Sequence, residues 1–281
     1  MKKFWWVAVF AGVILSGCGQ GDKVETKEVK FEINEPKTRV SLSVDFPVEA
    51  QNPTFLKQLQ KVVNVPFIGA HNNPNAALDI EENLKSEAEN FAAAAKQNVQ
   101  ELNKLGIEAS GYAEYIGEMR KIADTDGFVT YANFGYVYTG GAHGASFWDS
   151  WVVDKKSGDV VSDDLLNVQT GEPEFKEILK QGVIAYLAER KGSKSFNPEQ
   201  LQDELLDVVK ADDLPLPAAK AFLLDDGVGF VYGEYEISYY ANGNIAFVVP
   251  FDKMKPYLTP QAWALAEKGE KAQQIKPFFF N

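Results

Sequence analysis

One short run of this chain combines a histidine with three glycines, residue types that could do chemistry together. The run is Tyr138-Thr139-Gly140-Gly141-Ala142-His143-Gly144. Glycine permits positive φ angles and close approach of a ligand, and consecutive amide groups in such a loop can form a concave site for a carboxylate or a sugar oxygen. The alternative is that the glycines allow a tight crossing beneath another strand, with His143 bonded to a backbone carbonyl in the interior. We treat residues 140–144 as candidate binding residues.

Metal and cofactor chemistry have little support in this sequence. His71 is the only other histidine and Cys18 is the only cysteine, so any metal ion would need carboxylates to complete its coordination sphere. The chain has no Walker and no dinucleotide-binding fingerprint. We therefore predict neither a metal nor a cofactor.

Two catalytic arrangements can be considered. His143, Ser146 and Asp149 would supply a base, a nucleophile and an orienting acid, but in a strand Ser146 and Asp149 point to opposite faces, and no Gly-x-Ser-x-Gly elbow occurs. Glu234 and Glu236 could form a glycosidase pair, although a turn-stabilising role for Glu236 is favoured. We predict that the protein is not an enzyme and keep a hydrolase that uses the Gly-Gly-Ala-His-Gly loop as an alternative.

The N-terminal residues predict a location in the cell envelope. Lys2 and Lys3 precede an apolar segment over 4–15, which is too short to span a hydrocarbon core of roughly 30 Å. Residues 15–18, Leu-Ser-Gly-Cys, resemble a bacterial lipobox, so we predict a signal peptide over 1–17 and lipidation of Cys18. Acyl chains on Cys18 would anchor the protein to a membrane. Because Gly19 follows the cysteine, an outer-membrane location is favoured if the source has two membranes.

The charge of the chain limits its partners. With 28 basic and 40 acidic side chains, the formal net charge is −12. A nucleic-acid partner is disfavoured because phosphate binding needs a basic face. An acidic surface would accelerate the approach of a cationic partner, although general solubility explains the same charge.

Periodicity predicts strands and helices over most of the chain. Residues 18–36 are rich in Lys, Glu, Gly, Asp and Thr and predict a flexible tether after the lipidated cysteine. Alternation over 38–46 predicts a half-buried strand, and apolar spacing over 84–105 predicts an amphipathic helix. Further strands are expected over 109–123, 128–139 and 145–153, and further helices over 175–187 and 197–208.

These elements predict an α+β fold of two packed modules, each an antiparallel sheet covered by helices. The N-terminal module is expected over 37–140 and the C-terminal module over 141–259. A C-terminal helix and tail would follow over 260–281.

Two regions resemble a known family. The first is the Gly-Gly-Ala-His-Gly run itself. The second comprises Asp225-Asp226-Gly227, Tyr235-Glu236-Ile237, Tyr240-Ala241-x-Gly243 and the apolar run from Ile245 to Pro250. Both resemble the paired domains of unknown function in the RsiV-type anti-sigma-factor ectodomain and at the N-terminus of a peptidoglycan deacetylase. The second region would be a hairpin, two turns and a buried strand, and the C-terminal module is expected to be RsiV-like.

The resemblance implies a recognition function. We expect neither the sigma-binding segment nor the deacetylase domain of those relatives in this chain. Because the RsiV-type ectodomain recognises lysozyme, a basic muramidase, the leading hypothesis is binding of lysozyme or another peptidoglycan-active protein. The alternative is a peptidoglycan or glycan-binding module that uses exposed aromatics. Tyr235 and Glu236 join residues 140–144 as hypothetical binding residues.

Overall fold

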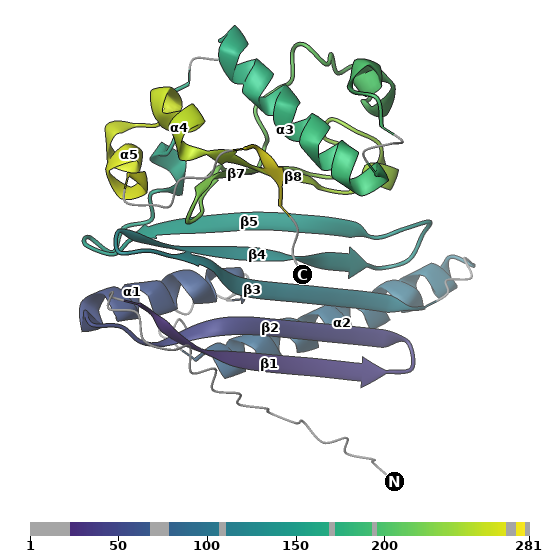
Figure 1. Cartoon of the computed structure of the whole chain (residues 1–281). Helices are drawn as coiled ribbons and strands as arrows, with labels where there is room; N and C mark the ends of the chain where they lie inside the picture. Colours follow the sequence, from purple (N-terminus) through teal and green to yellow (C-terminus); the bar gives the residue numbers. More distant parts are fainter. Residues whose placement is uncertain are drawn as a thin grey trace. The chain divides into compact units, whose positions relative to one another are not determined.

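The protein is described by a computed structural model that covers residues 23–67, 79–106, 111–168, 172–192, 196–267 and 274–278. The chain divides into two compact units (Figure 1). Unit 1 holds the described residues up to Lys121 together with Ala132–Phe147, and unit 2 holds Ile122–Tyr131 together with the described residues from Trp148 onward. The predicted signal peptide, Cys18 and His71 lie outside the described residues.

The first sheet has five strands in the order β1-β2-β3-β4-β5. Its strands are β1 (Glu25–Glu35), β2 (Thr38–Glu49), β3 (Ala113–Asp124), β4 (Phe128–Tyr138) and β5 (Ala145–Asp154). The last three strands each have residues in both units. The predicted module boundary at residues 140 and 141 does not match this division, because β4 and β5 on either side of it are neighbours in one sheet.

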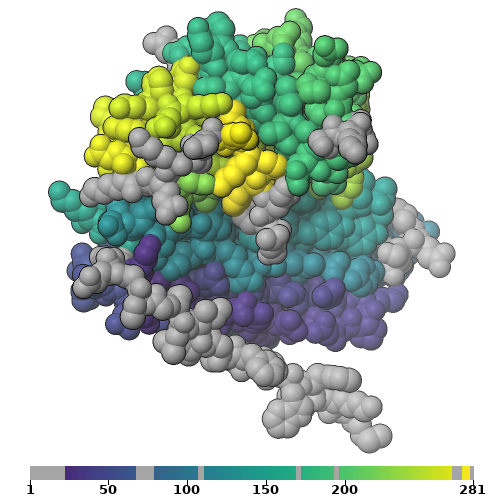
Figure 2. All heavy atoms as spheres, in the orientation of Figure 1, coloured from purple at the N-terminus to yellow at the C-terminus, as the bar shows by residue number. Residues whose placement is uncertain are grey.

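The predicted tether over 18–36 is wrong from Glu25 onward, because these residues form β1. Its apolar positions face those of β2, with Val29 opposite Val44 and Phe31 opposite Leu42. Three of the charged residues that suggested disorder, Glu28, Lys30 and Glu32, alternate with these apolar ones and lie on the other face. They also suit an edge strand, where charges discourage pairing with another chain. Figure 2 shows the purple residues of β1 and β2 at the surface.

One strand pair corrects the expectation of a purely antiparallel sheet. β2 and β3 run parallel, with Thr38 opposite Ala113 and Val44 opposite Met119. The chain crosses between them through α1 (Pro53–Asn64) and α2 (Ile80–Lys104), and such a crossover returns the chain in the same direction. The α+β class is confirmed, and unit 1 has a mixed sheet.

Helices cover one face of the sheet in unit 1. α1 buries Phe55 and Leu59, and α2 buries Leu84 and Ala88. Each helix begins at a polar cap: the Asn52 side chain accepts from two backbone amides of α1, and Asp79 accepts from the first turn of α2. Caps of this kind satisfy donors that the helix leaves without partners. Among the described helices, none is long and apolar enough to cross a membrane.

Unit 2 contains a second, antiparallel sheet of four strands in the order β6-β7-β8-β9. They are β6 (Phe222–Leu223), β7 (Gly227–Tyr232), β8 (Ile245–Pro250) and β9 (Lys276–Pro277). Every residue of β7 and β8 is buried, as the apolar run at 245–250 predicts. α3 (Pro173–Lys191) packs on β8, and the short helices α4 (Phe251–Met254) and α5 (Pro260–Ala266) follow. The helix expected over 197–208 is instead a 3₁₀-helix over Pro198–Glu204.

Candidate functional site

The glycine–histidine loop, residues 139–144, connects β4 to β5 in unit 1. Gly140 and Gly141 have φ angles of +110° and +97°, and a Cβ atom added to either would meet no atom within 4 Å. Only backbone conformation therefore demands glycine at these two positions. Gly141, Ala142 and His143 are exposed, so this part of the loop lies at the surface and not beneath another strand.

Gly144 is glycine for a different reason. A Cβ atom here would lie 2.3 Å from Cζ of Tyr136 and 2.5 Å from the carbonyl oxygen of Val137. The Gly144 amide donates to the Tyr136 hydroxyl at 3.1 Å, while the Tyr138 hydroxyl donates to the Gly141 carbonyl at 3.0 Å. Two tyrosines from alternate positions of β4 thus hold both ends of the loop. The close packing expected of the glycines is found at Gly144 alone.

His143 is exposed, as a binding residue would be, and it is also bonded to a backbone carbonyl, as the structural interpretation predicts. Its Nδ1 lies 2.8 Å from the carbonyl oxygen of Gly144. Because a carbonyl can only accept, this hydrogen bond requires the proton on Nδ1, which leaves Nε2 as an acceptor in the neutral ring. The expected bond to a backbone carbonyl is found, but the expected interior position is not, because His143 is exposed. Among the described residues, no group of three or more His, Cys, Asp and Glu side chains could hold a metal ion.

An aromatic residue and a lysine lie at the start of β3, beside the end of β4 that leads into the glycine–histidine loop. The ring of Tyr112, which is 39% exposed, has its centroid 6.2 Å from that of Tyr138. The Lys37 carbonyl accepts from the Ala113 amide at 2.9 Å, so the β1–β2 hairpin ends beside the start of β3. We call Lys37, Tyr112, Tyr138 and the glycine–histidine loop the loop end of unit 1. Figure 1 shows β3 beginning where β4 ends.

The other predicted binding residues lie in unit 2, in residues 233–237, which we call the tyrosine turn. Tyr235 has a φ angle of +62°, and among the described residues it is the only one other than glycine with a positive φ. Its side chain is 52% exposed, and its ring lies 5.8 Å from that of Tyr240. A bulky residue in this region is strained, so the surrounding structure must hold the conformation.

Glu236 supplies that support. Its two carboxylate oxygens accept from the amides of Gly233 at 2.7 Å and Ala218 at 2.6 Å. Hydrogen bonds to an ionised acceptor are among the stronger ones in proteins. Glu236 therefore fastens the tyrosine turn to the preceding segment, as the turn-stabilising interpretation expected. A glycosidase function would require this carboxylate to be available to substrate.

Burial keeps the phenol of Tyr232 protonated; this residue ends β7 directly before the tyrosine turn. Desolvation, and then the Glu236 carboxylate, raise the pKa of Tyr232 far above its ordinary value. Its hydroxyl consequently stays protonated and donates to the Pro215 carbonyl at 2.7 Å. This bond ties β7 to the segment that carries Ala218.

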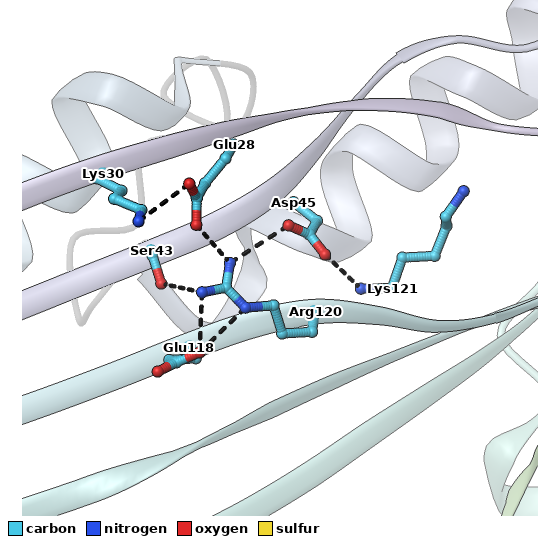
Figure 3. A network of polar contacts seen from close by, with 7 residues as sticks. All are labelled: Glu28, Lys30, Ser43, Asp45, Glu118, Arg120 and Lys121. Atoms are coloured by element: carbon cyan, nitrogen blue, oxygen red, sulfur yellow. Dashed lines mark hydrogen bonds and ion pairs between the residues drawn. The ribbon is translucent and has the colours of Figure 1, made fainter. Parts of the chain in front are cut away.

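A polar network on β1, β2 and β3 was not predicted from the sequence. The Nη1 atom of Arg120 lies 3.3 Å from Glu28 and from Asp45, and its Nη2 atom lies 2.8 Å from Glu118 and from Ser43 (Figure 3). The alternation of charged residues could have indicated a polar sheet face. Their convergence depends on the strand register, which joins residues 75 or more positions apart. The guanidinium stands among three carboxylates, so the positive charge of Arg120 is fully compensated within the network.

Comparisons with known proteins agree with this organisation. Residues 25–146 match the family model described as deacetylase PdaC, and residues 163–252 match the model described as a protein of unknown function, DUF3298. A comparison with curated protein sequences found no match.

Two solved structures share the fold. A DUF3298 family member from Bacteroides fragilis has 19% sequence identity and a TM-score of 0.61, with 88% of this chain and 98% of that chain covered. A DUF3298 family protein from Pseudomonas aeruginosa has 17% identity and a TM-score of 0.54, with 87% and 98% covered. The resemblance found in the two sequence regions is therefore confirmed: the chain carries a PdaC-type domain followed by a DUF3298 domain.

Proposed function

We propose that this protein is a recognition module of the cell envelope that binds lysozyme or another cationic, peptidoglycan-active protein. The observation that carries the proposal is Tyr235, a half-exposed aromatic side chain held in a strained backbone conformation. Strain of this kind persists where the surrounding structure fixes it and is concentrated at functional sites. Tyrosine is also one of the residues that contribute most to protein–protein interfaces.

The tyrosine turn is prepared for binding before a partner arrives. Both oxygens of Glu236 are bound to backbone amides, so the turn needs little further ordering when a partner docks. A binding element ordered in advance loses less conformational entropy on association. The ring of Tyr240 extends the aromatic surface beside Tyr235, and Tyr239, which precedes Tyr240 in the chain, is 44% exposed.

Charge supports a cationic partner. The formal net charge of −12 would attract a basic protein over long range and raise the association rate at low salt. Binding that depends on this attraction weakens as ionic strength increases. The affinity of a polar interface without charge complementarity would depend much less on ionic strength.

The test is calorimetric titration of the full chain, purified in a mild detergent, with lysozyme at low and moderate salt. A basic protein of similar size serves as the control ligand. We expect one-to-one binding that is selective for lysozyme and weaker at moderate salt. Tyr235→Ala should reduce the affinity at least about tenfold, the loss typical of an interface residue of this type, while Tyr112→Ala in unit 1 serves as a matched exposed-tyrosine control.

Absence of binding at both salt concentrations would refute the lysozyme hypothesis. Equal binding of the basic control protein would reduce the interaction to charge alone. Loss of affinity with Tyr112→Ala but not with Tyr235→Ala would show that the tyrosine turn is the wrong surface.

The proposal includes a lipid anchor at Cys18, with an outer-membrane location if the source has two membranes. More than one acyl chain is needed for stable attachment. Mass spectrometry of the N-terminal peptide should find acyl groups on Cys18 in the wild-type protein. The Cys18→Ser variant should lack them and leave the membrane fraction; retention of that variant in the membrane would contradict the anchor.

A further inference from the structure

We propose that the loop end of unit 1 is a binding site for a carboxylate-bearing saccharide, a function separate from protein recognition by the tyrosine turn. Three features lie there: a tyrosine pair with one exposed ring, a surface loop rich in backbone donors and a lysine ammonium group. Each suits a different part of such a ligand.

The tyrosine pair offers an apolar face with polar edges. The rings of Tyr112 and Tyr138 are tilted by 40° with their centroids 6.2 Å apart, and Tyr112 is 39% exposed. An aromatic ring that is apolar on its face and polar at its hydroxyl suits a partner with the same division. The C–H face of a pyranose ring and its surrounding hydroxyl groups have this character.

The glycine–histidine loop offers hydrogen-bond donors. Among the described residues, none accepts a bond from the amides of Gly140, Gly141 or Ala142. A Cβ atom added to Gly140 or to Gly141 would meet no atom within 4 Å, so a ligand oxygen can approach the backbone there. The bond from the Tyr138 hydroxyl to the Gly141 carbonyl fixes this backbone against the aromatic pair. Loops with successive amide groups of this kind favour anionic oxygens.

Lys37 selects the charge of the ligand. A Cβ atom on Gly111 would lie 3.1 Å from Lys37 Nζ, which places the ammonium group next to the residue that precedes Tyr112 in the chain. Lys37 is exposed, and no carboxylate of the described residues forms an ion pair with it. In a chain with a net charge of −12, such a lysine is a local site for a carboxylate.

The test compares two disaccharides that differ by one carboxylate. The acidic probe is N-acetylglucosamine joined to N-acetylmuramic acid, and the neutral probe is di-N-acetylglucosamine. Each is titrated into the full chain in detergent and followed by calorimetry and by saturation-transfer NMR. We expect the acidic probe to bind with a Kd of about 1 mM or lower, as a few hydrogen bonds and one ring contact allow. The neutral probe should bind at least about tenfold more weakly.

Three variants locate the site. Tyr112→Ala should weaken binding of the acidic probe about tenfold. Lys37→Gln should remove the preference for the acidic probe while leaving the weak binding of the neutral one. Tyr235→Ala, which changes an exposed tyrosine in unit 2, should leave both affinities unchanged. Circular dichroism establishes that each variant is folded. If Tyr112→Ala does not fold, Lys37→Gln still tests the site.

Four results would overturn the proposal: no binding of the acidic probe at 10-fold the expected Kd, equal affinity for both probes, unchanged affinity in Lys37→Gln and Tyr112→Ala, or an equal loss in Tyr235→Ala. Lysozyme titration of the same variants separates the two functions. Loss of saccharide binding without loss of lysozyme binding in Tyr112→Ala would support two independent sites.

Discussion

The glycine–histidine loop and the tyrosine turn solve the same conformational problem with different residues. Both require a positive φ angle at an exposed position: +97° at Gly141 and +62° at Tyr235. In the loop, glycine accepts this angle without a steric penalty, and two tyrosine hydroxyls hold the ends. In the turn, a bulky side chain takes the angle, and a carboxylate holds the backbone.

Hydrogen bonds that hold the backbone should contribute more to stability where a residue other than glycine takes a positive φ angle. A left-handed residue other than glycine costs about 1 to 2 kcal/mol, which the turn must offset through Glu236. The loop carries no such strain at its glycines. Removal of the support should therefore have a larger effect on the turn than on the loop.

The largest effect is expected for Glu236→Ala. This change leaves the amides of Gly233 and Ala218 without their acceptor, and we expect the free energy of unfolding to fall by about 3 kcal/mol. Urea denaturation measures the change. Glu236→Gln keeps one acceptor oxygen and should lose about half as much. If Glu236→Ala lost less stability than Glu236→Gln, the carboxylate would not be the group that supports the turn.

Gly144→Ala tests close packing at the end of the loop. Because its Cβ would lie 2.3 Å from Cζ of Tyr136 and 2.5 Å from a backbone oxygen, the strand or the ring must move. We expect a loss of about 2 kcal/mol in urea denaturation. A crystal structure or NMR shifts of Tyr136 would locate the displacement, and unchanged stability would refute the contact.

Gly141→Ala isolates backbone conformation, because a Cβ here meets no atom within 4 Å. The expected loss is about 1 kcal/mol, the lower end of the cost of a left-handed L residue. The measurement is the same denaturation curve. If Gly141→Ala destabilised the protein more than Gly144→Ala, the assignment of the two glycines to conformation and packing would be reversed.

The smallest effect is a gain in stability with Tyr235→Asn. Asparagine adopts left-handed conformations more readily than tyrosine, so we expect a gain of about 0.5 kcal/mol after loss of the ring contact with Tyr240. Lysozyme binding should be lost at the same time. Tyr239→Asn is the matched control, because Tyr239 is exposed but has a φ angle of −69°; a gain there as well would exclude relief of strain as the cause.

Much of the fold was predictable from local patterns. The strands over 128–138 and 145–154 and the helix over 80–104 match the expected elements closely, since alternation and helical spacing record which face is buried. β1 was missed because its charged residues dominate composition over 25–35, although Val29, Phe31 and Ile33 alternate among them. The parallel pairing of β2 with β3 depends on a crossover whose geometry no local pattern describes.

The candidate residues were predictable to different degrees. The glycines of the loop are conspicuous because glycine is the residue that positive φ angles require. The strain at Tyr235 has no such signal, since tyrosine does not normally mark a left-handed position. The partners of Arg120 lie on three strands, so their convergence could be found only from the register.

By itself the sequence determined the α+β class, the alternating strands, the amphipathic helices, and the two motifs that identify the paired domains. These properties follow from local periodicity and from residues with special backbone preferences. Only the tertiary structure decided that Lys37, Tyr112 and Tyr138 meet at the loop end of unit 1, that Gly144 is packed while Gly141 is open, and that Glu236 holds Tyr235. Each of these depends on contacts between segments distant in sequence, whose distances are set by strand register and packing.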